Sequence, residues 1–126
     1  QWVRQFLAGN HRSHWAEIVA CTRNFVDAIS GRNIGLAVSA VRRETAIRRE
    51  LTPQVLDGVG EKLVDAAESC GCAARFTGAG GGGCLWGLGE IENIDRLRKV
   101  WEETLSQRKN ARLLDLSIDS SGVVVH

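Results

Sequence analysis

The residues best suited to chemistry in this 126-residue chain form one segment, Thr77-Gly78-Ala79-Gly80-Gly81-Gly82-Gly83-Cys84. Five of the six positions 78–83 are glycine, and apolar runs flank the segment on both sides. Because glycine has no Cβ and reaches positive φ freely, such backbone passes very close to other groups, although ordering it costs about 0.5–1 kcal/mol per glycine relative to alanine. Bare N–H groups suit phosphates, carboxylates or another tight loop. The segment therefore predicts a binding loop; a flexible hinge is the alternative, and the apolar flanks argue against a solvated linker.

Two common glycine motifs fit this segment poorly. Gly78, Gly80 and Gly83 satisfy G-x-G-x-x-G, but that dinucleotide fingerprint requires a helix directly after the loop. Residues 84–88, with Gly87 and Gly89 near their end, are a poor start for a helix. The phosphate loop of the Walker type is excluded because no Gly-Lys-Ser/Thr sequence follows.

Thiols and imidazoles give only weak signals for a metal site. We interpret the cysteines as reduced and mostly buried thiols, because their spacing resembles neither a disulfide framework nor a zinc site; they are Cys21, Cys70, Cys72 and Cys84. His11 and His14 are three residues apart and are expected on a helix surface. The sequence thus predicts no metal ligands.

The composition is that of one soluble globular domain, with 44% hydrophobic residues, 25% charged residues and a net charge of +1. This charge gives no reason to expect nucleic acid or an anionic membrane as a partner. The apolar runs are too short to span a bilayer, and we see no charged-then-apolar leader. The reduced thiols lead us to expect a cytoplasmic protein. The first residue is Gln1 rather than methionine, which suggests a piece of a longer chain.

The hydrophobic periodicity predicts which elements position the loop. Three helices are expected first: 13–29 with Ser13 as N-cap, 33–50, and a third that begins at Thr52-Pro53 and ends at Gly71. Strands at 73–77 and 84–88 then flank the glycine loop. A helix at 93–109, capped by Asn93, and strands at 111–119 and 123–125 complete the order. This order predicts an α+β fold, with helices packed on one face of a mainly antiparallel sheet.

Apolar stripes on the expected helices give the candidate core. In the first helix we expect an inward stripe of Trp15, Ile18, Val19, Phe25, Val26 and Ile29, and in the last one of Ile94, Leu97, Val100, Trp101 and Leu105. The second half of helix 33–50 is charged, with Glu44 four residues before Arg48. This charged run is either a solvated face or a surface that touches substrate, and the sequence leaves both interpretations open.

The full string Ala74 to Trp86 resembles the third, C-terminal signature of the GHMP small-molecule kinases, which include galactokinase, homoserine kinase and mevalonate kinase. The segment from Arg42 to Pro53 is similar to the one that precedes this signature in the sugar and heptose-phosphate kinase branch. The resemblance implies a ferredoxin-like C-terminal domain over residues 1–126. The N-terminal domain with the ATP loop of the family would then be absent from this chain.

The resemblance also implies a function. The intact enzyme would transfer the γ-phosphoryl group of ATP, with Mg, to a hydroxyl of a small molecule such as a sugar or sugar phosphate. Its loop residues would pack at the nucleotide and substrate cleft, and these are Thr77, Gly78, Ala79, Gly80, Gly81, Gly82 and Gly83. ATP and Mg would be bound mainly by the chain's own N-terminal domain. We also expect an apolar surface where that domain would pack, formed by Trp2, Phe6 and part of the Trp86 strand, and self-association through it would make a homodimer.

No residue of this chain is a candidate catalytic base, so the fragment alone is expected to be inactive. Two other hypotheses stay open at this point. One is a ligand-sensing or interaction module whose glycine loop binds a small anion, and the other is a structural domain whose loop merely permits tight strand packing.

Overall fold

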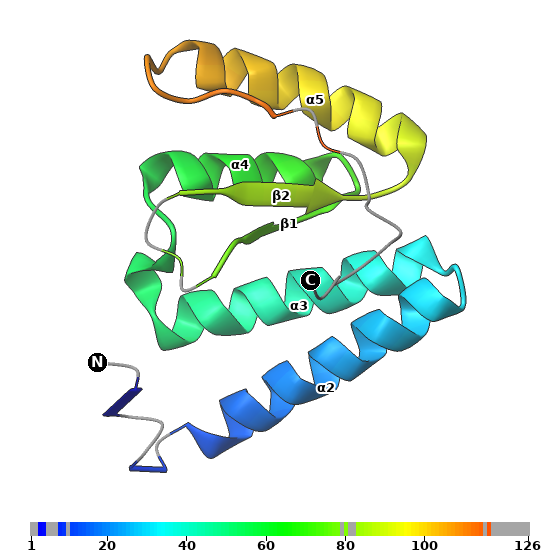
Figure 1. The fold of residues 1–126 in the computed structure, drawn as a ribbon, viewed down its shortest axis with the longest axis vertical. Helices are drawn as coiled ribbons and strands as arrows, with labels where there is room; N and C mark the ends of the chain where they lie inside the picture. Colours follow the sequence, from blue (N-terminus) through cyan, green and yellow to red (C-terminus); the bar gives the residue numbers. More distant parts are fainter. Residues whose placement is uncertain are drawn as a thin grey trace, which may run out of the picture.

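The computed structural model describes residues 3–4, 8–9, 11–78, 80, 83–114 and 116. It confirms the α+β class, with four helices and a two-stranded antiparallel sheet (Figure 1). In chain order the elements are α2 (Arg12–Ser30), α3 (Ile34–Leu51), the 3-10 helix η1 (Pro53–Val55), α4 (Gly58–Ser69), β1 (Ala73–Phe76), β2 (Leu85–Leu88) and α5 (Ile91–Ser106).

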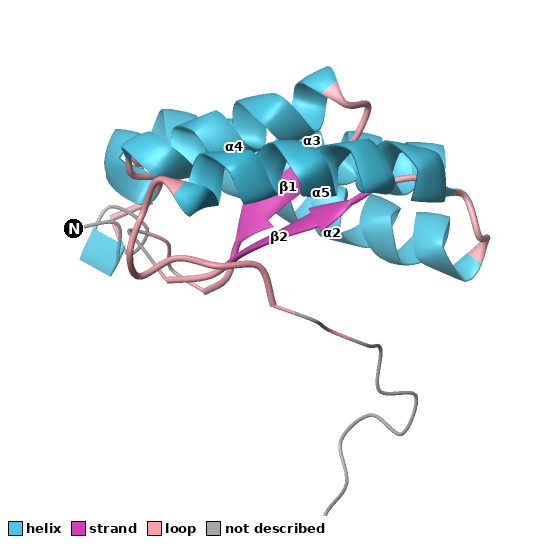
Figure 2. Cartoon of the chain, turned by 90° about the horizontal axis from the view of Figure 1, so that it is seen from above, coloured by secondary structure: helices cyan, strands magenta, loops and turns pink. Residues whose placement is uncertain are grey.

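The strands form a hairpin around the glycine loop. Ala73 lies opposite Leu88, and Phe76 lies opposite Leu85. The hydroxyl of Thr45 on α3 donates a hydrogen bond of 2.9 Å to the carbonyl of Ala74, so α3 lies directly beside β1. Figure 2 shows α3 and α4 on the same side of the strand pair, as expected for helices that cover one face of a sheet.

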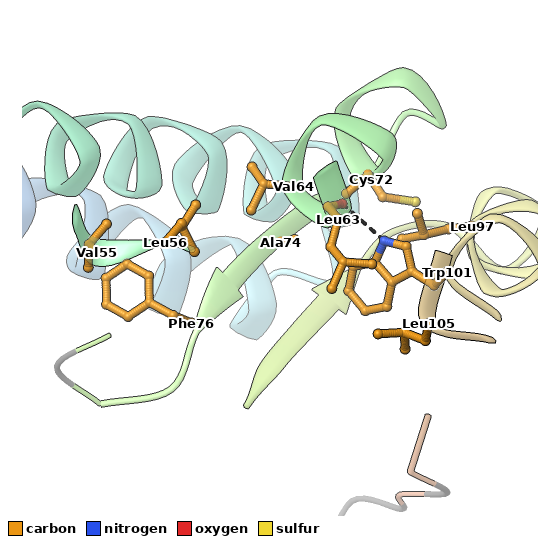
Figure 3. Packing of buried hydrophobic residues seen from close by; sticks show 11 residues of the cluster. Val55, Leu56, Leu63, Val64, Cys72, Ala74, Phe76, Leu97, Trp101 and Leu105 are labelled. Carbon is orange, nitrogen blue, oxygen red and sulfur yellow. Dashed lines mark hydrogen bonds between the residues drawn. The ribbon is translucent and has the colours of Figure 1, made fainter. Parts of the chain in front are cut away.

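The largest part of the core lies between α4, β1 and α5 (Figure 3). The indole Nε1 of Trp101 donates a hydrogen bond of 3.0 Å to the carbonyl of Leu63 and so ties α5 to α4. Leu97, Trp101 and Leu105 face inward as the periodicity predicted, whereas Val100 is exposed. On β2, a Cβ at Gly87 would lie only 3.2 Å from the Trp101 ring, so the glycine allows α5 to pack close to the sheet.

The predicted stripe of the first helix is partly wrong. Val19, Val26 and Ile29 are exposed, and the buried positions of α2 are Ile18, Cys21 and Ala28. The reason is that α2 packs chiefly against α3, and a single helical neighbour covers only a narrow strip of its surface.

The predicted starts of the first and third helices need correction. The helix α2 already begins at Arg12, so Ser13 lies inside it and is not its N-cap. Thr52-Pro53 opens the short 3-10 helix η1 and not α4. The helix α4 is instead capped by Asp57, whose Oδ1 accepts a hydrogen bond of 2.7 Å from the Gly60 N–H.

The last helix also differs from its prediction in both bounds. The N-cap of α5 is Glu90, and Asn93 lies inside the helix, where its Oδ1 accepts a hydrogen bond of 2.5 Å from Arg96. Because α5 already begins at Ile91, Asn93 cannot act as its N-cap. The helix ends at Ser106, earlier than the predicted 109.

The strand predicted at 111–119 is not present in residues 111–114, which have no regular secondary structure. Most of the rest of that strand, and the whole strand predicted at 123–125, lie outside the described residues. Among the helices that the structure describes, none has the length and apolarity to cross a membrane.

Candidate functional site

The predicted binding loop joins β1 to β2. The N–H of Thr77 donates a hydrogen bond of 2.9 Å to the carbonyl of Cys84, which extends the hairpin by one step beyond the strands. Thr77, Gly78 and Gly83 are exposed and Gly80 is half-buried. Ala79, Gly81 and Gly82 lie outside the described residues, so their part in the site stays a prediction.

Three glycines of the loop have positive φ: +72° at Gly78, +86° at Gly80 and +88° at Gly83. Other residues are strained in this region, so these positions favour glycine on conformational grounds alone.

The surroundings of the three glycines differ, which indicates that Gly80 has a packing role and that Gly78 and Gly83 do not. A Cβ at Gly80 would lie 2.8 Å from the carbonyl oxygen of Val55 and 3.2 Å from the ring of Phe76. Gly80 is therefore pressed against η1 and anchors the loop. Among the described residues, none has an atom within 4 Å of a Cβ at Gly78 or Gly83, so these residues leave the bare backbone open to a visiting group at both positions.

A hollow of about 210 Å³ lies beside the loop. Gly83 and Cys84 border it on the loop side, while Asp57 and Gly60 border it at the start of α4. Arg108, just after α5, contributes the cationic group of the lining. Because Asp57 already caps α4, the N-terminus of this helix is less available to an anion than the open loop backbone is.

Next to the loop, an ion pair joins β1 to α3. Arg75 approaches both carboxylate oxygens of Glu44, with Nε 2.5 Å from Oε2 and Nη2 3.1 Å from Oε1. Its Nη1 donates a further hydrogen bond of 2.7 Å to the carbonyl of Phe76, the last residue before the loop. This bidentate pair therefore connects α3 to the root of the loop.

Glu44 is buried, yet it is held in its charged form. Burial by itself opposes ionisation of this carboxyl, but the hydrogen bonds and charges of Arg75 and Arg48 outweigh it and lower the pKa of Glu44 below its ordinary value. Arg48 contributes through a bond of 3.0 Å from its Nε to Oε1, the pairing of residues four apart that the sequence indicated.

The other arginines of the charged run also tie elements together. Arg42 donates to the carbonyls of Cys72 at 2.7 Å and Glu68 at 3.0 Å, and so reaches the C-terminal end of α4. Arg43 pairs with Glu17 of α2 at 2.7 Å, and Arg49 pairs with Glu61 of α4. These contacts are intramolecular, so the arginines do more than cover a solvated face.

Sequence reasoning missed the Glu44–Arg75 pair because its members are 31 positions apart. A signal was available nonetheless. Glu44 follows Val38 and Val41 at steps of three and so falls on the buried stripe of α3, where a carboxylate needs a cationic partner. Arg75 has the matching position on a buried strand.

The described loop fits the approach of a phosphate-bearing molecule, because open backbone at Gly78 and Gly83 leaves room that side chains would fill. Thr77 adds a hydroxyl that donates no hydrogen bond to another described residue. The described part of the chain contains no group of three or more His, Cys, Asp or Glu side chains that could hold a metal ion. We therefore assign no metal ligand to these residues.

Comparison with known proteins identifies the family. The family model described as GHMP kinases C terminal matches residues 37–107, which include α4, the hairpin with its glycine loop, α5 and most of α3. Neither a search of curated proteins nor a search of solved structures found a match. The match covers more than half of the chain and includes the loop and the Glu44–Arg75 pair, so the chain belongs to the GHMP kinase C-terminal family.

Proposed function

We propose that this chain is the C-terminal domain of an ATP-dependent kinase that phosphorylates a hydroxyl of a small molecule, most specifically a sugar or sugar phosphate. The observation that carries the proposal is the glycine loop within the family match, with open backbone at Gly78 and Gly83. The sugar class rests on the likeness of residues 42–53 to the sugar-kinase branch.

Each described part of the loop has a definite task in this proposal. Gly80 fixes the loop against Val55, and Arg75 holds the carbonyl of Phe76 at its root. The open N–H groups of the loop would then face the acceptor or the phosphate chain of the nucleotide. Orientation of the reactants and neutralisation of their charge account for much of the rate of phosphoryl transfer. The Thr77 hydroxyl would donate a hydrogen bond to the same group.

ATP with Mg supplies the phosphoryl group when bound, and in this proposal the N-terminal domain of the same protein holds most of it. The residues of this chain would close the cleft from the other side. That closure would exclude water from the acceptor and hold the acceptor hydroxyl in place.

The test is an assay of ADP formation by the full-length protein that contains this chain. The acceptor panel would comprise sugars, sugar phosphates, homoserine and mevalonate, each measured against a reaction without acceptor. We expect acceptor-dependent ADP formation with a member of the sugar group, and none from residues 1–126 alone. The absence of acceptor-dependent turnover with any of these compounds would overturn the kinase proposal, and turnover only with homoserine or mevalonate would overturn the sugar class.

A further inference from the structure

A second hollow, of about 220 Å³, lies between α2, α3 and the hairpin. Apolar walls come from Phe25 on α2, Val41 on α3 and Trp86 on β2. None of the described loop residues lines it, so this hollow is separate from the candidate site at the glycine loop.

The positive and negative side-chain charges among the described residues that line this hollow are unequal in number. Glu44 provides one negative charge, whereas Arg48 and Arg75 provide two positive charges. Arg43 and Glu17, which do not line the hollow, neutralise each other through an ion pair of 2.7 Å. The described residues that line the hollow therefore carry one net positive charge.

Arg48 is the cation that remains available. Arg75 already uses three nitrogens on Glu44 and on the Phe76 carbonyl. Arg48 uses only Nε, and its two terminal nitrogens donate no hydrogen bond to another described residue. Its guanidinium lies 5.2 Å from the centre of the Trp15 ring, which together with the bond to Glu44 fixes its orientation. A partly buried and oriented guanidinium suits a carboxylate or a phosphate.

We propose that this hollow binds a small molecule with an apolar or aromatic body and a single anionic group, which contacts Arg48. The size is suitable, because an apolar cavity of about 150 Å³ is known to take up benzene. The walls offer little hydrogen bonding to a polyhydroxylated body, since the Thr22 hydroxyl is already engaged with the Ile18 carbonyl. This ligand class differs from a sugar acceptor, and the inference does not depend on the kinase proposal.

The experiment is a titration of the 126-residue chain with benzoate, phenyl phosphate and benzamide, followed by two-dimensional ¹H–¹⁵N NMR. We expect at least one of the two anions to bind on the order of tenfold more tightly than neutral benzamide, as one charge-assisted contact provides. The shifts should centre on Phe25, Val41 and the Trp86 indole. Preference between benzoate and phenyl phosphate then tells whether the natural anion is a carboxylate or a phosphate.

Variants test the role of Arg48. Arg48→Gln should abolish the preference for the anions, and Arg48→Lys should retain part of it. Arg49→Gln is the matched control, since Arg49 pairs with Glu61 and does not line the hollow; this variant should bind the anions as the wild type does. If Arg48→Gln does not fold, added salt gives the same information, because screening should weaken the binding of the anions and leave benzamide unaffected.

Several results would overturn the proposal. The proposal fails if neither anion binds, or if benzamide binds as tightly as the anions do. It also fails if the NMR shift changes lie away from the hollow, or if folded Arg48→Gln still prefers the anions.

Discussion

Arg75 on β1 and Glu44 on α3 form a two-point ion pair, with one contact of 2.5 Å and another of 3.1 Å, directly behind the glycine loop. The side chain of Glu44 is only 10% exposed and that of Arg75 only 21% exposed. The pair joins the helix that begins the family match to the strand that leads into the loop. It is thus a largely buried polar connection between the helical part of the fold and the candidate site.

Replacement of Glu44 by glutamine should destabilise the protein markedly. The substitution keeps the shape but removes the charge, so Arg75 and Arg48 lose a shared and largely buried partner. We expect the free energy of unfolding, from urea denaturation, to fall by about 1–3 kcal/mol. Glu17→Gln is the control, because the pair of Glu17 with Arg43 is exposed to solvent and should contribute much less to stability. Equal losses in the two variants would show that burial of the Glu44 pair is unimportant.

The same carboxyl predicts a pH dependence. The folded protein lowers the pKa of Glu44, so the unfolded chain takes up the proton more readily than the folded chain does. The stability advantage of the wild type over Glu44→Gln should be full above the unfolded pKa of about 4.3 and should be lost as the pH falls through the lower folded pKa. Urea denaturation of both proteins over this acid range measures the difference. An advantage that grows toward acid pH would contradict the assignment.

The order of elements was predictable because local patterns dominate it. The change of hydrophobic period at Gly71 marks the passage from helices to strands, and the loop lies between two short apolar runs. Helix starts were less predictable because several residues compete for each cap. Asn33 and Asp57 accept the capping hydrogen bonds, whereas Ser13 and Asn93 lie inside their helices.

The candidate site was predictable only in part. The glycine string is a local signal and could be read directly from the sequence. Gly80 packs against Val55, whereas Gly78 and Gly83 do not. This difference could not be predicted from the sequence, because Val55 lies 25 positions before Gly80, in η1. Long-range partners of this kind, like Glu44 for Arg75, are set by tertiary packing and leave little trace in local spacing.

A close contact between the end of β2 and the start of β1 gives a third prediction. A Cβ at Gly89 would lie 2.6 Å from the sulfur of Cys72, a fully buried side chain. Gly89→Ala should therefore destabilise the protein by about 1–3 kcal/mol through overpacking. Cys72→Ala removes the sulfur with which that Cβ would collide. The loss of stability in the double variant should therefore be smaller than the sum of the losses in the two single variants. Additive losses in thermal or urea denaturation would argue against this contact.

The cysteines should differ sharply in reactivity. Burial is the main cause that raises the pKa of both Cys21 and Cys72, and Cys72 is the more completely buried of the two. Cys84, in contrast, is exposed next to the loop. In the native protein iodoacetamide should modify Cys84 first, and Cys72 only after unfolding, as mass spectrometry of the peptides would show. Early modification of Cys72 would mean that the contact between the strands opens readily.

The open backbone at Gly78 distinguishes a working loop from a passive connector. Asparagine tolerates the positive φ at this position far better than other residues do, so Gly78→Asn adds a side chain to the open space at little conformational cost. Gly80→Ala serves as the structural counterpart, since its Cβ would collide with Val55. We expect Gly80→Ala to lower the melting temperature and Gly78→Asn to leave it nearly unchanged.

The most direct test is the kcat/KM for acceptor-dependent ADP formation by the full-length protein with Gly78→Asn, relative to the wild type. If the bare backbone at Gly78 faces the reacting molecules, kcat/KM should fall on the order of a hundredfold, equivalent to about 2.7 kcal/mol of transition-state stabilisation, while the melting temperature stays close to that of the wild type. A variant that folds normally and retains the kcat/KM of the wild type would contradict the role assigned to the loop.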